Sequence, residues 1–334
     1  MQEKKHKNIT FVGGTGAANI AQAAKQIPDW YVQILVSLVD DGGSTGRLRK
    51  QLNIAPVGDI KKALLALSQL SNEQIRALDY RFEQGELKGH TVGNLILAGF
   101  LKNFPDPNQS IDLIKEIFKI KGQVITTTLT NGKLETEFAS GYIIKGEHNL
   151  DENLETNIGR PVAYRLTNNP EANPRAIKAL KESKLVVLGP GDLGANTIAP
   201  ILTTKITQAI RQSPGKLVYI PNLMTKKGET DQLTVHDCAQ MIEKIIRRQF
   251  DYILINTQPI PKEIIKLYQS QGEAPMPLAL DKLKKTGAQL IGSNFLQTGV
   301  LKKSKADRLR RSVLVHHGQK VIKQLKKIIT PDSY

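Results

Sequence analysis

The chain repeats one local pattern along most of its length. In five places a short run rich in β-branched residues is followed by a polar loop that contains glycine or proline, and then by a helical stretch. Strands that alternate with helices are typical of a parallel sheet with helices on both faces. We therefore predict an α/β fold built on a doubly wound, mostly parallel sheet. Ligands of such sheets bind beyond the carboxyl ends of the strands, and every loop of the pattern lies at that edge.

Two regions depart from this rhythm. Residues 56–110 lack strand-like runs and are predicted to form a small helical insertion. Residues 120–168 alternate like strands around Asn131-Gly132, a dipeptide typical of tight hairpin turns, and predict a β-hairpin region. A chain of 334 residues is long enough for one large α/β domain that carries both. We predict a single Rossmann-like domain over residues 1–334.

The formal net charge of +16 raises the question of an acidic partner. Half of this excess positive charge falls after residue 300, where the chain has ten lysines and arginines and only two aspartates. Residues 300–334 also carry apolar side chains at helical spacing, so a basic helical segment is predicted there. It either docks an apolar stripe on the domain or offers a surface to nucleic acid or membrane. Only 5% of residues are aromatic and none interleaves the basic run, which argues against a nucleic-acid module.

Cysteine content and hydropathy exclude further classes of protein. The chain has one cysteine, Cys238, so neither an internal disulfide nor a multi-cysteine metal site is available, and we interpret it as a buried helical side chain. No apolar run approaches eighteen uninterrupted residues, and the first residues have no apolar core of signal-peptide length. We predict a cytoplasmic protein with no membrane span.

The first glycine-rich loop, Gly13-Gly14-Thr15-Gly16, follows a strand and opens a helix. Unpaired backbone N–H groups and the helix dipole favour an anion at such a place, and glycines let a phosphate approach the main chain. The stretch begins like the dinucleotide fingerprint, but Asn19 stands at the third glycine position and no P-loop lysine is present. A tight turn without a ligand is the alternative.

The second loop crowds opposite charges into one turn. Asp40 and Asp41 end the second strand, where carboxylates either bind ribose hydroxyls or hold a divalent cation such as Mg²⁺ beside a diphosphate. The residues that follow supply backbone and hydroxyl donors and a cation: Gly42, Gly43, Ser44 and Arg47. The alternative is structural, with Asp40 paired to Arg47 and Asp41 capping a helix.

Three further loops carry polar residues outside the apolar periodicity. Asp59 stands just before a helix and is either an N-cap or a ligand residue. His90 and Asn94 occupy the mouth of another helix beside two glycines, which favours a ligand role. A later loop holds Asn222, Thr225, Glu229 and Thr230, and Thr234 with Asp237 beyond it resembles a helix-capping pair.

Six motifs together carry a resemblance to a known family. VGGTG, DDGGSTGRLR, PVGDIKKALLAL, GHTVGNL, LGPGD and NLMTKKGETD occur in this order between about residue 8 and about residue 300. In this order and spread they resemble the YvcK family of the CofD-like superfamily, proteins called gluconeogenesis factors. The resemblance implies a Rossmann-like core with a small helical insert. It also implies binding of a nucleotide sugar, typically UDP-N-acetylglucosamine, a role in carbon metabolism and cell-envelope or cell-shape maintenance, and no firmly established turnover.

The resemblance also suggests which residues bind. Gly13, Gly14, Thr15 and Gly16 would meet the diphosphate, and Asp40, Asp41, Gly42, Gly43 and Ser44 would line the same crevice. The helical insert would supply Gly58, Asp59, His90 and Asn94, and the far side Gly189, Gly191, Asn222, Thr225, Glu229 and Thr230. Three positions depart from the family pattern: Val12, Lys61 and Asp192, where Asp192 replaces a hydroxyl by a charge.

An enzymatic relative leaves a second function open. A CofD-type transferase moves a phospholactyl group from a nucleoside-diphosphate-activated donor to a deazaflavin precursor, and these loops offer the positioning and the metal-binding carboxylates that such a step needs. The chain shows no evident aromatic pocket for the acceptor ring, so the binding and regulatory function is favoured. No catalytic residue is assigned. Whether the protein forms a homo-oligomer stays open.

Overall fold

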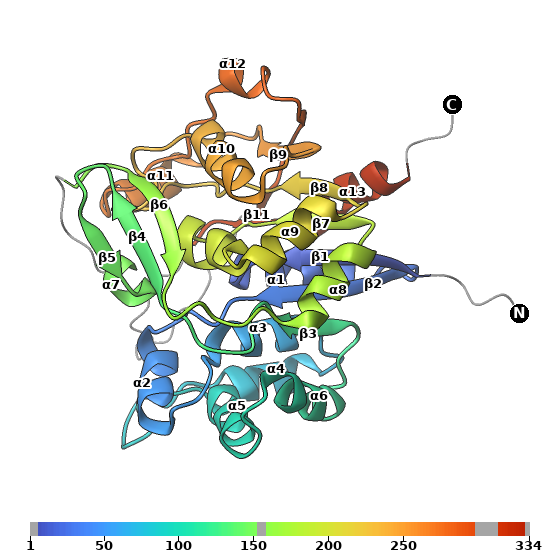
Figure 1. Cartoon of the computed structure of the whole chain (residues 1–334), viewed down its shortest axis with the longest axis vertical. Coiled ribbons are helices and arrows are strands. Elements are labelled where there is room, and N and C mark those ends of the chain that lie inside the picture. Colours follow the sequence, from blue (N-terminus) through green and yellow to red (C-terminus); the bar gives the residue numbers. More distant parts are fainter. Residues whose placement is uncertain (1–5, 152–157, 298–312, 331–334) are drawn as a thin grey trace, which may run out of the picture.

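The computed structural model describes residues 6–151, 158–297 and 313–330. Its centre is a seven-stranded sheet in the order β10-β9-β8-β7-β1-β2-β3, and every strand pair in it is parallel (Figure 1). This confirms the predicted doubly wound, Rossmann-like α/β fold. The strands are β1 (Lys7–Val12), β2 (Trp30–Val36), β3 (Gln123–Thr126), β7 (Leu185–Leu188), β8 (Lys216–Tyr219), β9 (Tyr252–Asn256) and β10 (Gln289–Ser293).

The strand order reverses at one place in this sheet. The chain runs outward from β1 through β2 to β3 on one side, and from β7 through β8 and β9 to β10 on the other, while β1 and β7 pair with each other. Loops that leave the carboxyl ends of such a pair of strands turn to opposite faces and open a crevice between them. We therefore expect the ligand crevice at this switch point, between the loops that begin at Gly13 and Gly189.

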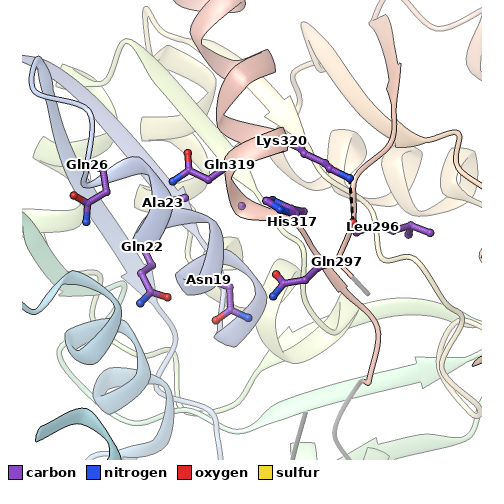
Figure 2. Close-up of a pocket in the computed structure, with 10 residues that line it drawn as sticks. Asn19, Gln22, Ala23, Gln26, Leu296, Gln297, His317, Gln319 and Lys320 are labelled. Carbon is purple, nitrogen blue, oxygen red and sulfur yellow. Dashed lines mark hydrogen bonds between the residues drawn. The ribbon is translucent and has the colours of Figure 1, made fainter. Parts of the chain in front are cut away.

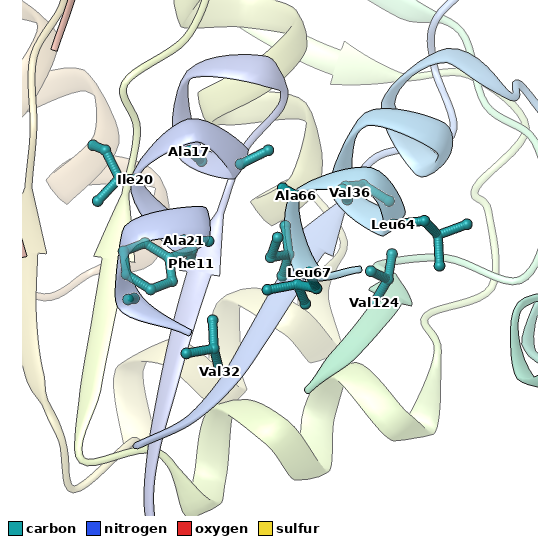
Figure 3. Packing of buried hydrophobic residues seen from close by; sticks show 14 of the residues in the cluster. Phe11, Ala17, Ile20, Ala21, Val32, Val36, Leu64, Ala66, Leu67 and Val124 are labelled. Carbon is teal, nitrogen blue, oxygen red and sulfur yellow. The ribbon is translucent and has the colours of Figure 1, made fainter. Parts of the chain in front are cut away.

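Helices cover both faces of the sheet and create two cores. On one face α1 (Thr15–Ala24) and α3 (Gly58–Leu67) pack on β1, β2 and β3, and α13 (Gly318–Ile329) packs on α1. Phe11, Ile20 and Leu64 are fully buried in this core (Figure 3). The other face carries α8 (Pro174–Glu182), α9 (Thr204–Gln212) and α10 (Val235–Ile246). Alternate residues of β1 enter the two cores because a strand directs successive side chains to opposite faces.

The regular elements between β2 and β3 are all helices. After α2 (Gly43–Leu52) come α3, α4 (Asn72–Asp79), α5 (Val92–Asn103) and α6 (Pro107–Ile117). The predicted insertion of residues 56–110 falls within this run, whose last helix continues to Ile117. Because α3 packs on β2, β3 and α1, it serves as the crossover helix of the sheet, and its first turn faces the carboxyl edge.

A small antiparallel sheet stands beside the main one, in the order β5-β4-β6. It comprises β4 (Leu134–Phe138), β5 (Ile143–Lys145) and β6 (Pro161–Leu166), and the short helix α7 (Glu147–Asp151) follows β5. The expected hairpin turn at Asn131-Gly132 is wrong, since this dipeptide connects β3 to β4 in different sheets. The dipeptide is held in this place by a long-range contact, in which Nδ2 of Asn131 donates to the carbonyl of Ile54. The tight turn between β4 and β5 contains Gly141 instead, at φ +84°.

The C-terminal part packs against the start of the chain. Helix α13 buries Val321, Ile322 and Leu325 in the core and lies along α1, while Lys323, Lys326 and Lys327 are exposed. Residues 318–329 therefore have the docked arrangement, whereas residues 300–312 of the predicted basic segment lie outside the described residues. Further elements in the second half of the chain are η2 (Ala199–Ile201), α11 (Lys262–Gln269), α12 (Leu280–Leu283), β11 (Leu296–Gln297) and β12 (Val315–His316). Within the described residues, no helix has both the length and the apolar character needed to span a bilayer.

Candidate ligand-binding site

The loops after β1 and β7 touch each other across the switch point. A Cβ atom on Gly16 would lie 2.5 Å from the carbonyl oxygen of Pro190, and one on Gly14 would lie 2.6 Å from Oδ1 of Asn196. Position 16 therefore requires glycine because a Cβ there would meet backbone, whereas a Cβ at position 14 would displace the end of the Asn196 side chain. Gly13 donates its N–H to Leu35, which ties the loop to β2. The main chain at the start of α1 thus lies directly against the carbonyl of Pro190 and the side chain of Asn196.

Helix α1 begins in this loop without a side-chain cap from the described residues, so its first-turn N–H groups are not satisfied by a side chain. Nζ of Lys62, from the first turns of α3, donates to Oγ1 of Thr15 at 2.5 Å. Lys62 also lies 4.0 Å from Oδ1 of Asp59. A helix N-terminus with an ammonium group beside it favours an anionic group such as a phosphate.

Asp40 lies close to the start of α3. Its Oδ1 accepts from the N–H of Gly42 at 3.0 Å. On the other side of the carboxyl group, a Cβ on Gly58 would lie 2.6 Å from Oδ2 of Asp40 and 2.7 Å from Oγ1 of Thr45. Only a glycine at position 58 lets α3 begin so close to this carboxylate.

The charge of Asp40 is unfavourable in this place. Burial, followed by the nearby charge of Asp59, raises the pKa of Asp40 from 3.8 to about 6, against the smaller opposing effects of the Gly42 N–H, Lys62 and Thr45. Two carboxylates that repel each other next to an anion site are the arrangement that a divalent cation relieves. Within the described ranges, no group of three or more histidine, cysteine or acidic side chains has metal-site geometry. A cation here would rely on this pair and on oxygens of its ligand.

The carboxylate of Asp41 contacts the small antiparallel sheet. Its Oδ1 accepts from the N–H of His148 at 2.8 Å, and its Oδ2 fits against Gly146, whose φ of +95° suits glycine. The side chain therefore holds the β5–α7 corner of the small sheet against the loop before α2. The adjacent carboxylates Asp40 and Asp41 have different surroundings, and only Asp40 lies beside Asp59.

The arginines of this loop contact main-chain carbonyls. Arg49 donates to the carbonyls of Val39, Asp40 and Gly132, at 3.2, 3.3 and 2.9 Å. Arg47 donates to the carbonyl of Lys88 at 2.8 Å and does not pair with Asp40. Both side chains brace the loop, and Arg47 ties α2 to the segment that precedes α5.

Ser44, His90 and Asn94 form a buried polar cluster where α2 and α5 begin. Oγ of Ser44 lies 2.9 Å from Nδ1 of His90 and accepts from Nδ2 of Asn94 at 3.0 Å. Burial, Arg47 and Arg81 lower the pKa of His90. Oδ1 of Asn94 is buried and has no hydrogen-bond partner among the described residues. Gly43 begins α2 directly before Ser44, with φ +47°.

The loops after β7 and β8 are joined across the crevice. Oδ1 of Asn222 accepts from the N–H of Gly191 at 2.9 Å. Gly191 and Gly14 both pack on the side chain of Asn196, which projects from the π-helical turn η1 (Leu193–Ile198). Gly189 has φ +76° and precedes a cis peptide bond to Pro190. Asn196 therefore lies between the first glycine loop and the far loops.

Three of the predicted far-side residues make internal contacts. Oγ1 of Thr225 accepts from the N–H of Ala274 at 2.9 Å, and Oγ1 of Thr230 accepts from the N–H of Lys226 at 2.8 Å. Oε1 of Glu229 accepts from the N–H of Gly194 at 2.7 Å. Thr225, Glu229 and Thr230 are all buried and shape the loop from behind.

Asp192, the charged departure from the family pattern, is paired. Its Oδ2 accepts from Nζ of Lys226 at 2.8 Å, with 37% of the Asp192 side chain and 19% of the Lys226 side chain exposed. The pair joins the loop after β7 to the loop after β8, one residue beyond Gly191. The carboxylate is thus compensated within the chain.

A separate hollow of about 710 Å³ lies along α1, away from these contacts (Figure 2). It is bordered mainly by amide side chains, namely Asn19 and Gln22 of α1 and Gln26 just after it, with Gln297, His317 and Lys320 opposite. None of its lining residues was predicted as a ligand residue.

The sequence matches the family model described as 2-phospho-L-lactate transferase CofD over residues 9–296. The chain belongs to the CofD family. Among similar proteins, a putative gluconeogenesis factor from Thermotoga maritima is 30% identical over 84% of this chain and 88% of its own length. A gluconeogenesis factor from Bacillus subtilis is 32% identical over 86% of this chain and 90% of that protein.

A solved structure of a UPF0052-family protein from Bacillus halodurans is also similar. It superposes with a TM-score of 0.87 at 30% identity, covering 96% of this chain and 99% of that one. The resemblance to the gluconeogenesis factors of the CofD-like superfamily, inferred from six motifs, is thereby confirmed.

Two contributors to the site were not predicted from sequence, Lys62 and Asn196. Lys62 has the spacing of an ordinary exposed helical lysine, and it reaches the site because α3 packs against α1. Asn196 belongs to a π-helical turn, whose residues do not follow the 3.6-residue period. The only signal for Asn196 was its position shortly after the glycine loop that begins at Gly189.

Proposed function

We propose that this CofD-family protein binds a nucleoside-diphosphate-linked sugar, of which UDP-N-acetylglucosamine is the type, in the crevice between β1 and β7. The observation that carries the proposal is the glycine-lined start of α1, where Lys62 donates to Thr15 and where the loop that begins at Gly189 makes close contact. The diphosphate would bind to the first-turn N–H groups of α1 and to Lys62. Because its relatives are gluconeogenesis factors, we further propose a regulatory role in carbon metabolism and cell-envelope or cell-shape maintenance.

A divalent cation fits the proposed site. Asp40 and Asp59 would hold it beside the diphosphate, since Mg²⁺ in proteins commonly takes one or two carboxylates together with phosphate oxygens. The pKa of Asp40, raised to about 6 by burial and by Asp59, supports a carboxyl group placed to receive positive charge. The surroundings of Asp41 make it less suited to this role than Asp40.

The polar cluster and the far loop would hold the remainder of the ligand. Oδ1 of Asn94 is buried without a partner among the described residues, so it would accept from a ligand N–H or O–H group. Asn222 keeps Gly191 in place and presents its amide at the opposite wall. These contacts are suited to the neutral ends of a nucleotide sugar rather than to its phosphates.

Isothermal titration with UDP-N-acetylglucosamine and Mg²⁺ tests the proposal. Lys62→Met should weaken binding about 10- to 100-fold, as expected for the loss of a hydrogen bond between a lysine and a phosphate. The matched control is Lys178→Met on α8, whose side chain is 74% exposed and pairs with Glu182 at 3.9 Å. If both variants bind as the unmodified protein does, or if no UDP-sugar binds, this ligand assignment is wrong.

A second candidate is a CofD-type phospholactyl transferase, favoured by the description of the matched family model. It would use the same loops for a nucleoside-diphosphate-activated donor, and the Asp40–Asp59 pair for a cation that stabilises the departing phosphate. With 5% aromatic residues, the chain offers few rings for stacking a deazaflavin acceptor. Incubation with the guanosine-diphosphate donor and the deazaflavin, followed by mass spectrometry, decides: a phospholactyl product supports the transferase, and its absence together with UDP-sugar binding supports the first proposal.

A further inference from the structure

The ion pair between Asp192 and Lys226 lies at the far side of the proposed site. Its location follows from a continuous set of contacts, in which Gly14 packs on Asn196, Asn196 packs on Gly191, and Asp192 is the next residue. A ligand whose diphosphate lies at the start of α1 and extends across the switch point would reach this pair with its distal end.

Both partners are held by their backbones. The carbonyl of Asp192 accepts from the N–H groups of Asn196 and Thr197, each at 3.0 Å. The N–H of Lys226 donates to Thr230 at 2.8 Å, and its carbonyl accepts from the N–H of Thr230 at 2.8 Å. The fixed backbones keep the two side chains within reach of each other, so the pair is formed before a ligand binds.

The charge balance of the pair determines what it accepts. A lysine without a carboxylate partner at this wall would attract a second acidic group on the ligand. With Asp192 at 2.8 Å the pair is neutral overall, and the carboxylate oxygens are available as acceptors for hydroxyl groups. An acidic group brought next to Asp192 meets like-charge repulsion, a common way to reject a wrong ligand.

We propose that Asp192 and Lys226 form a specificity element that accepts a neutral, hydroxyl-bearing sugar at the distal end of the ligand and rejects a ligand whose distal end carries a carboxylate. This inference rests on the proposed binding of a nucleotide sugar and goes further by naming the chemical class of its distal group. It also bears on the transferase alternative, because a phospholactyl donor carries a carboxylate at that end.

The probes are UDP-glucose and UDP-glucuronate, which differ only in a hydroxymethyl group against a carboxylate, and UDP as a ligand without the sugar. Titrations of the full chain should show about tenfold tighter binding of UDP-glucose than of UDP-glucuronate, the size expected for one like-charge contact in a partly exposed place. Asp192→Asn should reduce this ratio to near unity or reverse it, while the affinity for UDP stays unchanged. Lys226→Gln should increase the ratio, because it leaves the carboxylate unpaired.

The matched control is Asp112→Asn, which removes an exposed carboxylate paired with Arg175 at 2.8 Å on α6 and α8. The ratio should stay at its original value in this variant. Equal affinities for the two sugars in the unmodified protein, or a ratio that Asp192→Asn leaves unchanged, would overturn the inference. Failure of UDP and of both UDP-sugars to bind would instead remove the proposed function, and this specificity element with it.

Discussion

Replacing Asp40 by asparagine should stabilise the protein at neutral pH even though Asp40 lies in the proposed site. Burial and the charge of Asp59 raise the pKa of Asp40 from 3.8 to about 6. Between these values the folded protein keeps a proton that the unfolded chain has released, so the free energy of unfolding falls as the pH rises from about 4 to about 6. Above about pH 6 the folded state carries the full cost of the ionised carboxylate.

The magnitude follows from the size of this pKa change. A rise from 3.8 to about 6 corresponds to about 3 kcal/mol, at about 1.4 kcal/mol per pKa unit. Asparagine keeps an oxygen for the N–H of Gly42, which lies 3.0 Å from Oδ1 of Asp40, and carries no charge to be repelled by Asp59. Asp40→Asn should therefore be about as stable as the unmodified protein at pH 4 and about 3 kcal/mol more stable at pH 7.

Urea unfolding between about pH 4 and about pH 7.5 measures the effect. The single tryptophan, Trp30, is 5% exposed in β2 and reports unfolding by fluorescence. Asp41→Asn serves as the control, because its amide oxygen still accepts from His148 and the pH dependence that originates at Asp40 should persist. A stability difference between Asp40→Asn and the unmodified protein that stays constant over this pH range would refute the placement of Asp40 beside Asp59.

Two further predictions concern packing. Gly16→Ala places a Cβ 2.5 Å from the carbonyl of Pro190 and should cost about 1–3 kcal/mol of unfolding free energy and weaken UDP-sugar binding, whereas Gly99→Ala, with open space around it in α5, should stabilise by about 0.5–1 kcal/mol. A Gly16→Ala variant that is as stable as Gly99→Ala would contradict the close contact. Leu325→Ala, at 0% exposure in α13, should cost about 2–5 kcal/mol in urea unfolding, while Lys323→Ala on the outer face should change it by less than about 0.5 kcal/mol. Equal effects would mean that α13 is not docked.

Stability and binding are expected to oppose each other at Asp40. The carboxylate that costs free energy in the unliganded protein is the group that a cation and a diphosphate would compensate. Functional sites commonly retain such destabilising groups because a better-satisfied residue would not bind. Asp40→Asn should thus gain stability and lose the contribution of Mg²⁺ to UDP-sugar affinity, which the same titrations measure.

Several features could be predicted from neighbouring residues alone. The spacing of Thr234 and Asp237 predicts a capping pair, and the structure confirms it. Oγ1 of Thr234 accepts from the N–H of Asp237 at 3.2 Å, and Oδ2 of Asp237 accepts from the N–H of Thr234 at 2.9 Å. Cys238 is buried in α10 as expected, and burial raises its pKa to about 12. The alternation of strands, glycine loops and helices likewise predicts the doubly wound sheet. These features can be predicted because strand and helix periods and capping depend on residues a few positions apart.

Long-range packing decided the rest. Asp40 and Asp41 are adjacent and chemically identical, yet one faces Asp59 and the other the β5–α7 corner, because α3 and the small sheet approach the loop from different sides. Lys62 reaches Thr15, 47 positions earlier in the chain, only because α3 packs against α1. The hairpin signal of Asn131-Gly132 was overridden by contacts to the loop beyond α2. Local patterns specify what each segment becomes, whereas the direction in which a loop side chain points depends on which distant segments pack around it.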